Sequence, residues 1–243
     1  MYIQDYFGFL IAILVCMALS AMASARVSST FKKFDKVRAS SGMTGYDTVR
    51  RLMQANNVQG ISIGKVSGQL TDHYHPVKRI INLSDATYSS SSVAAVAVAA
   101  HEMGHVMQKK NHYLFYNLRT ALVPVVNIGS FLAMPLVLLG LVLDSIVRTA
   151  TPEMGFQVAM LGVLLYGGSL VFALVTLPVE LNASRRAKQM LRQEGIVSDQ
   201  QLSGADKVLD AAAMTYLASL VTSAVYFLRF ALYVMTLFGR RRD

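Results

Sequence analysis

Two histidines four residues apart flank a glutamate in the stretch His101-Glu102-Met103-Gly104-His105. The stretch reads as part of a helix, where side chains four positions apart share one face, so both imidazoles can reach a single metal ion. Glu102 cannot easily become a third ligand from its place beside His101, but it can reach a water bound to the ion. In zinc hydrolases the ion lowers the pKa of that water, the glutamate takes its proton, and the hydroxide attacks a carbonyl carbon. The spacing therefore predicts one Zn²⁺ per chain, with two histidine ligands and Glu102 as general base.

A third ligand must come from elsewhere in the chain, because a catalytic zinc takes three protein ligands and leaves one position open. The best candidate is Glu180, which closely follows an apolar stretch. A lone carboxylate at the end of such a stretch is costly without a partner, and the metal would supply one. An ion pair with Arg185 or Arg186 is the alternative use of Glu180. The other candidates for the third ligand are His73, His75, His112 and Asp144.

The composition indicates a membrane protein. Of the 243 residues, 53% are hydrophobic and 15% are charged, against about 25% charged in an ordinary soluble domain. A helix needs about 20 apolar residues to cross a bilayer. Four stretches are long enough: 6–25, 122–146, 156–177 and 209–238. No basic residue precedes the first stretch, which favours an uncleaved anchor over a signal peptide.

The formal net charge of +9 is concentrated in two segments between the apolar stretches. Residues 26–120 hold 13 lysines and arginines and residues 178–208 hold five, whereas the 148–155 connection holds only Arg148. Because basic segments stay in the cytoplasm, we expect both of them inside a bacterial plasma membrane and the N-terminus outside. The basic C-terminus (240–242) stays in the cytoplasm only if the last stretch enters the membrane without crossing it. If that stretch crosses fully, the basic C-terminus lies outside, against the rule that basic segments stay in the cytoplasm.

The 26–120 segment is large enough for a small domain outside the membrane. The expected elements are a helix over 40–56, short strands and turns over 58–70, a strand over 77–83 and a helix over 93–110. The four-serine stretch 89–92 is expected to supply the N-cap of the last helix, and Ile80 to Ser84 is the expected exposed sheet edge, to which a peptide could add as a strand. With 178–208 as a further cytoplasmic segment, we expect a mostly α, multi-span integral membrane protein whose small α+β zincin-like domain carries the HExxH helix.

Five runs of sequence match one known pattern. They are DHYHP at 72–76, LS at 83–84, SVAAVAVAAHEMGH at 92–105, LPVELNASRRA at 177–187 and AAAMTY at 211–216. In these runs the chain resembles the YugP-type family of bacterial membrane-bound neutral zinc metallopeptidases. The resemblance implies a membrane-anchored peptidase with zinc on His101 and His105, Glu102 as base and Glu180 as third ligand. His75 departs from the family pattern, which favours an acidic residue there.

Groups that orient the histidines are the next requirement of such a site. Enzymes similar to thermolysin place an aspartate four residues after the ligand glutamate, where it holds a ligating histidine by its far nitrogen. Here Ser184 occupies that position. The candidates for this role are therefore Ser184, Asn182, Asp206 and Asp210.

These features predict a membrane-embedded zinc endopeptidase at the cytoplasmic membrane surface, acting on membrane-proximal or unfolded protein segments. Its partners would be the lipid bilayer and a protein or peptide substrate, with an oligomer or a membrane partner protein left open. We expect no nucleic acid, because the sequence lacks the interleaved basic and aromatic residues that stack bases. The alternative is a non-catalytic membrane scaffold or adaptor that keeps zinc for structure.

Overall fold

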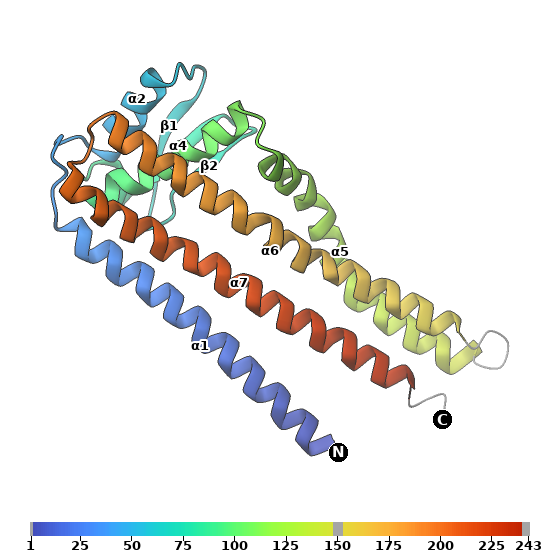
Figure 1. Cartoon of the computed structure of the whole chain (residues 1–243). Helices are drawn as coiled ribbons and strands as arrows, with labels where there is room; N and C mark the ends of the chain where they lie inside the picture. The colour runs from blue at the N-terminus through green and yellow to red at the C-terminus, as the bar shows by residue number, and fades with distance from the viewer. Residues whose placement is uncertain (1, 148–152, 240–243) are drawn as a thin grey trace. The chain divides into compact units, whose positions relative to one another are not determined.

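The computed structural model describes residues 2–147 and 153–239, and helices dominate it (Figure 1). Contacts divide the chain into two compact units, each drawn from separate parts of the sequence. The apolar unit contains the described residues of 1–19, 118–177 and 217–243, and the mixed unit contains 20–117 and 178–216. Arg148 and the basic C-terminus (240–242), on which the expected orientation partly depends, lie outside the described residues.

Four long helices carry the apolar stretches. They are α1 (Tyr2–Asp35), α5 (Leu114–Val147), α6 (Met154–Gln193) and α7 (Asp199–Gly239). Each contains a segment long and apolar enough to cross a membrane, and each expected apolar stretch lies inside one of these helices. The helices extend beyond the apolar stretches because polar residues of good helix propensity continue them, as in 185–193 of α6. Where the bilayer begins and ends on each helix stays a prediction.

Small residues let the helices of the apolar unit approach closely. A Cβ atom added to Gly140 of α5 would lie 2.5 Å from the carbonyl oxygen of Gly155 in α6, and one added to Gly162 would lie 2.6 Å from that of Ala133. Close backbone approach through glycine and alanine is typical of helices that pack inside a membrane. The packing within this unit therefore agrees with the apolar character of its helices.

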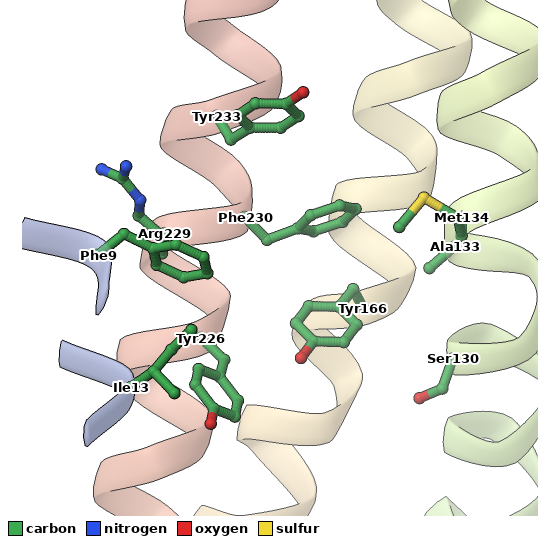
Figure 2. Close-up of a pocket in the computed structure, with 10 residues that line it drawn as sticks. All are labelled: Phe9, Ile13, Ser130, Ala133, Met134, Tyr166, Tyr226, Arg229, Phe230 and Tyr233. Carbon is green, nitrogen blue, oxygen red and sulfur yellow. The ribbon is translucent and has the colours of Figure 1, made fainter. Parts of the chain in front are cut away.

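A cavity of about 720 Å³ lies within the apolar unit, as Figure 2 shows. Arg229, a charged residue in the middle of the last apolar stretch, lines this cavity. Its guanidinium carbon lies 5.1 Å from the centre of the Phe9 ring. A cation over an aromatic face gains electrostatic attraction, so this contact partly offsets the cost of a charge on an apolar helix.

The mixed unit contains a small sheet and the motif helix. Its elements are α2 (Gly45–Ala55), β1 (Ser62–Val66), β2 (His73–His75), β3 (Ile80–Ser84), α3 (Asp85–Tyr88) and α4 (Val93–Lys110). Figure 1 shows them gathered beside the last part of α6 and the first part of α7. Leu83 of β3, Met103 of α4 and Leu191 of α6 are fully buried in one shared core. This core fixes the motif helix against both the sheet and α6.

The sheet has the strand order β1-β3-β2. β1 pairs with β3 in parallel, and β2 pairs with β3 antiparallel. Our expectation that Ile80 to Ser84 forms an exposed edge is therefore wrong, because β3 is the central strand and the edges are β1 and β2. The side chains of Ile81 and Leu83 are fully buried, and buried backbone groups need hydrogen-bond partners, which pairing on both sides supplies. The strand begins at Ile80 rather than Val77 because residues 76–79 form a turn.

Local capping sets where the two main helices of the mixed unit begin. α2 begins at Gly45, later than the 40–56 expectation, because Thr44 and Asp47 form a capping box. The Thr44 hydroxyl and backbone N–H donate to Asp47 and lower the pKa of its carboxyl. α4 has the expected bounds, and the hydroxyl of Ser92 accepts from the backbone N–H of Ala95 at 3.0 Å. The predicted N-cap is thus confirmed.

Candidate metal centre

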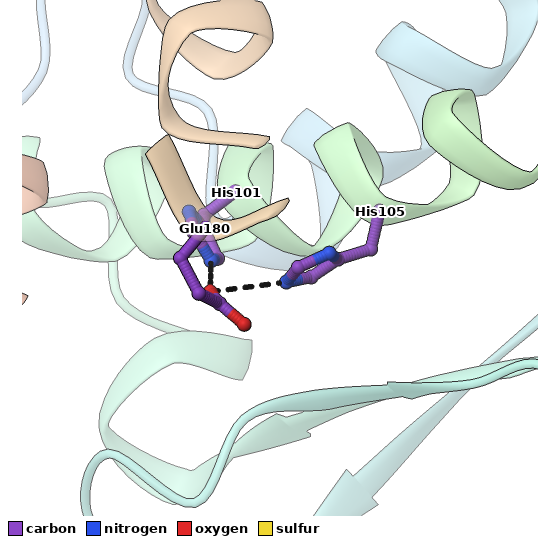
Figure 3. A group of neighbouring side chains, drawn as sticks. All are labelled: His101, His105 and Glu180. Atoms are coloured by element: carbon purple, nitrogen blue, oxygen red, sulfur yellow. Dashed lines mark hydrogen bonds and ion pairs between the residues drawn. The ribbon is translucent and has the colours of Figure 1, made fainter. Parts of the chain in front are cut away.

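His101, His105 and Glu180 converge on one point of the mixed unit (Figure 3). The Nε2 atom of His101 lies 3.2 Å from Oε2 of Glu180, and the Nε2 atom of His105 lies 3.5 Å from the same oxygen. Zinc bonds of about 2.0–2.2 Å at tetrahedral angles separate ligand atoms by about 3.4 Å. Two imidazole nitrogens and a carboxylate oxygen at this spacing fit a zinc ion, both in donor chemistry and in distance.

The electrostatics of the cluster also favour a cation. Glu180 is almost fully buried, with 2% of its surface exposed. Burial disfavours the protonated form of His105, but the hydrogen bond and charge of Glu180 outweigh that cost and raise the pKa of the imidazole. The carboxylate therefore draws positive charge to the point at which the two imidazoles meet, which is where a metal ligated by all three residues would lie.

Gly104 lets the two helices that carry these residues come close together. The histidines lie on α4 and Glu180 lies on α6. A Cβ atom added to Gly104 would lie 2.5 Å from the carbonyl oxygen of Ala183, less than any side chain tolerates. Glycine inside the motif thus allows the contact between α4 and α6 that brings the carboxylate to the histidines.

Gln108 fixes the orientation of His105. Its Nε2 donates to the carbonyl oxygen of Val179 at 2.7 Å and to Oδ1 of Asn182 at 3.1 Å. The amide oxygen of Gln108 is therefore the atom that faces Nδ1 of His105, at 3.0 Å. An amide oxygen only accepts, so Nδ1 carries the proton and Nε2 keeps its lone pair for a metal. The sequence reasoning missed Gln108, although its place three residues after His105 puts it on the same helix face.

His101 is oriented from α6. The hydroxyl of Ser184 lies 3.2 Å from Nδ1 of His101, which leaves Nε2 to face Glu180. Among the four residues that the sequence left open for this role, Ser184 therefore contacts a histidine directly, and Asn182 acts through Gln108. The two aspartates lie elsewhere, since Asp206 and Asp210 both pair with Lys188.

Glu102 lies beside the cluster with only 6% of its surface exposed. Burial raises the pKa of its carboxyl, whereas His105 and His101 oppose that effect. Glu102 and His101 both line a cavity of about 180 Å³. The carboxyl thus borders a space that a substrate could enter next to the ligands.

The alternative third ligands lie outside this group. Within the part of the chain that the structure describes, the cluster of candidate metal ligands holds His101, His105 and Glu180 and none of the others. His73 and His75 belong to β2, where His73 contacts Asn82 and His75 accepts from the backbone of Lys78. The remaining two are His112, which follows α4, and Asp144, which belongs to α5 in the apolar unit.

Comparisons with known proteins agree with this chemistry. The family described as "Putative neutral zinc metallopeptidase" matches residues 9–235. The "Putative membrane protease YugP" of Bacillus subtilis (strain 168) is 39% identical over 224 residues, which cover 92% of this chain and 95% of that protein. No solved structure matches. The resemblance seen in the sequence is therefore confirmed, and a zinc cofactor agrees with both the family and the cluster. The chain belongs to the family described as "Putative neutral zinc metallopeptidase" and is related to the "Putative membrane protease YugP".

Proposed function

We propose that this protein is a membrane-embedded endopeptidase that binds one zinc ion through His101, His105 and Glu180 and uses Glu102 as its general base. The observation that carries the proposal is the convergence of two imidazole nitrogens on one carboxylate oxygen, at 3.2 and 3.5 Å. When bound, zinc polarises the peptide carbonyl and lowers the pKa of the attacking water.

The residues of the chain perform the remaining tasks. Gln108 and Ser184 hold the two imidazoles with Nε2 toward Glu180. The Glu102 carboxylate accepts the proton of the attacking water and passes it to the leaving amine. Proton transfer by such a positioned group contributes about 10²–10⁴-fold to the rate.

The proposed place of the reaction is the cytoplasmic surface of a bacterial plasma membrane. Two features support it: the four apolar helices and the concentration of lysine and arginine in 26–120 and 178–208, the segments that supply the histidines and Glu180. The proposed substrates are membrane-proximal or unfolded protein segments. An extended segment could pair with one of the edge strands β1 and β2, which keep one side without a neighbouring strand within the described sheet.

The substitution Glu102→Gln separates an enzyme from a zinc-bearing scaffold. The amide cannot take a proton, so we expect the purified variant to retain one zinc per chain and lose at least about 100-fold in peptide cleavage. Zinc is measured by elemental analysis, and cleavage by mass spectrometry on an unfolded protein in detergent. Wild-type protein that holds zinc but cuts no peptide, with a cellular phenotype unchanged by Glu102→Gln, would favour the scaffold.

A further inference from the structure

A second feature of the site is the cavity of about 180 Å³ beside Glu102 and His101. Its apolar walls come from α1, α4 and α7: Val27, Phe31, Val98, Val208, Leu209 and Ala212. All of these residues belong to the mixed unit. The cavity is therefore lined mainly by apolar side chains and lies next to Glu102, the proposed general base.

The size of the cavity suits one side chain. Its volume is about 180 Å³, or about six times the 30 Å³ that one water occupies in the liquid. Sites for whole cofactors or small molecules usually measure about 300–1,000 Å³. The space is thus too small for such a ligand and large enough for the side chain of a leucine or phenylalanine.

Besides Glu102, one further acidic residue, Asp72, lines the cavity, and it does not make the cavity a site for basic side chains. One of its carboxylate oxygens accepts from the backbone N–H of Ser84 at 2.7 Å, and the other accepts from the Ser84 hydroxyl at 2.8 Å. The carboxylate therefore already holds the end of β3 with both oxygens. The surface that it leaves to a ligand is mainly apolar.

Leu70 adds an apolar side chain at the cavity in an unusual way. Its backbone has φ +59°, the left-handed region that bulky residues rarely adopt, and 37% of the residue stays exposed. Because Leu70 is exposed, its side chain adds no packing to the hydrophobic core that would offset the cost of this backbone conformation. It is explained if the side chain of Leu70 packs on a bound ligand.

We propose that this cavity binds the side chain of a large apolar residue, of the leucine or phenylalanine type, adjacent to the peptide bond that is cut. The inference rests on the proposed function, because it assigns a preference to the same site. The substrates are then polypeptide segments that carry such a residue beside the cleavage point.

Cleavage of three matched peptides tests this preference. They differ at one position beside the cut, which holds leucine, alanine or lysine. An apolar pocket discriminates by about 10–200-fold per methylene group lost, so kcat/KM for the leucine peptide should exceed that for the alanine peptide at least 10-fold. Equal rates on the leucine and alanine peptides, or a preference for lysine, would overturn the proposal.

Substitutions in the cavity wall test whether the preference for leucine arises from this cavity. Ala212→Leu fills the space and should reduce the leucine-to-alanine ratio of kcat/KM at least tenfold. The matched control is Ala213→Leu, since Ala213 is the next residue of α7 and does not line the cavity. Val98→Ala enlarges the space and should raise the ratio of phenylalanine to leucine cleavage, which tests the pocket even if the filled variant fails to fold. Ratios that stay unchanged in both wall variants contradict the assignment.

A binding measurement separates this inference from the proposed function. Fluorescence anisotropy of labelled peptides on zinc-loaded Glu102→Gln protein reports the pocket without any cleavage. Tighter binding of the leucine peptide than of the alanine peptide, with the difference lost when Ala212→Leu is added, supports the pocket. If the wild type then cuts neither peptide, the proposed function fails and the pocket assignment stands. Cleavage by the wild type with no preference in either assay leaves the proposed function standing and removes the pocket.

Discussion

The two ring nitrogens of each histidine have separate partners in this site. In His105, Nδ1 faces the amide oxygen of Gln108 and Nε2 faces Glu180. In His101, Nδ1 faces Ser184 and Nε2 faces the same carboxylate. The amide oxygen of Gln108 only accepts and so decides which nitrogen of His105 keeps its lone pair, and the Ser184 hydroxyl fixes the direction of the His101 ring. Residues that do not ligate the metal thus control how well the histidines bind it.

Replacement of Gln108 by leucine tests this control. The variant removes the acceptor for His105 and the side-chain donor to the carbonyl oxygen of Val179, so we expect zinc affinity to fall about 10–100-fold. Competition with a fluorescent zinc chelator measures the dissociation constant. Gln54→Leu, on the exposed face of α2, is the control and should bind zinc as the wild type does. An unchanged constant in Gln108→Leu would show that the amide has no orienting role.

The residues of this cluster could be predicted from the sequence because each leaves either a local pattern or an energetically costly side chain. The spacing of His101 and His105 is a property of one helix, and a carboxylate near an apolar stretch, such as Glu180, is expensive without a partner. That the three residues bind zinc stays a prediction. Gln108 was missed because a glutamine on a helix has many uses, and its partners Val179 and Asn182 come from a distant part of the chain.

At the scale of elements, α4 and β3 show what local sequence can and cannot predict. α4 has the predicted bounds, because Ser92 and the last basic turn act on the helix that they adjoin. β3 was placed correctly as a strand but wrongly as an edge. Strand order depends on pairing between segments far apart in sequence, here β1 with β3, and no local pattern reports it.

The contact between α4 and α6 can be tested at Gly104. In Gly104→Ala the new Cβ meets the carbonyl oxygen of Ala183, so the helices must separate, at a cost of about 1–3 kcal/mol. We expect a lower melting temperature together with weaker zinc binding, because Glu180 moves away from the histidines. The control is Gly8→Ala, where nothing lies within 4 Å of the added atom. Wild-type zinc affinity in Gly104→Ala would mean that close approach of the helices does not position the carboxylate.

For the whole molecule, composition and charge predicted the class of protein but not the placement of its parts. The apolar stretches lie in α1, α5, α6 and α7, which fit a membrane protein together with the membrane-protease relative. The orientation in the membrane depends on charges in loops, including Arg148 and the basic C-terminus, which lie outside the described residues. The cytoplasmic position of the site therefore stays a proposal.

Labelling of single cysteines tests the orientation. In a Cys16→Ser background, Val77→Cys places a thiol at a residue that is 84% exposed, and Glu153→Cys places one at an exposed residue next to α6. A maleimide that cannot cross membranes should label Glu153→Cys in intact cells and Val77→Cys only after the cells are opened. Labelling of Val77→Cys in intact cells would put the mixed unit outside and refute the proposed topology.

The most direct test of the account is the zinc affinity of Glu180→Ala beside that of the wild type, with Glu153→Ala as the control carboxylate. Removal of a ligand should weaken binding by more than the about 10–100-fold that an orienting residue contributes, with a circular dichroism spectrum that stays unchanged. The account predicts one zinc per chain in the wild type and in Glu153→Ala, and a purified Glu180→Ala protein that has lost its zinc. One zinc per chain at wild-type affinity in Glu180→Ala would contradict it.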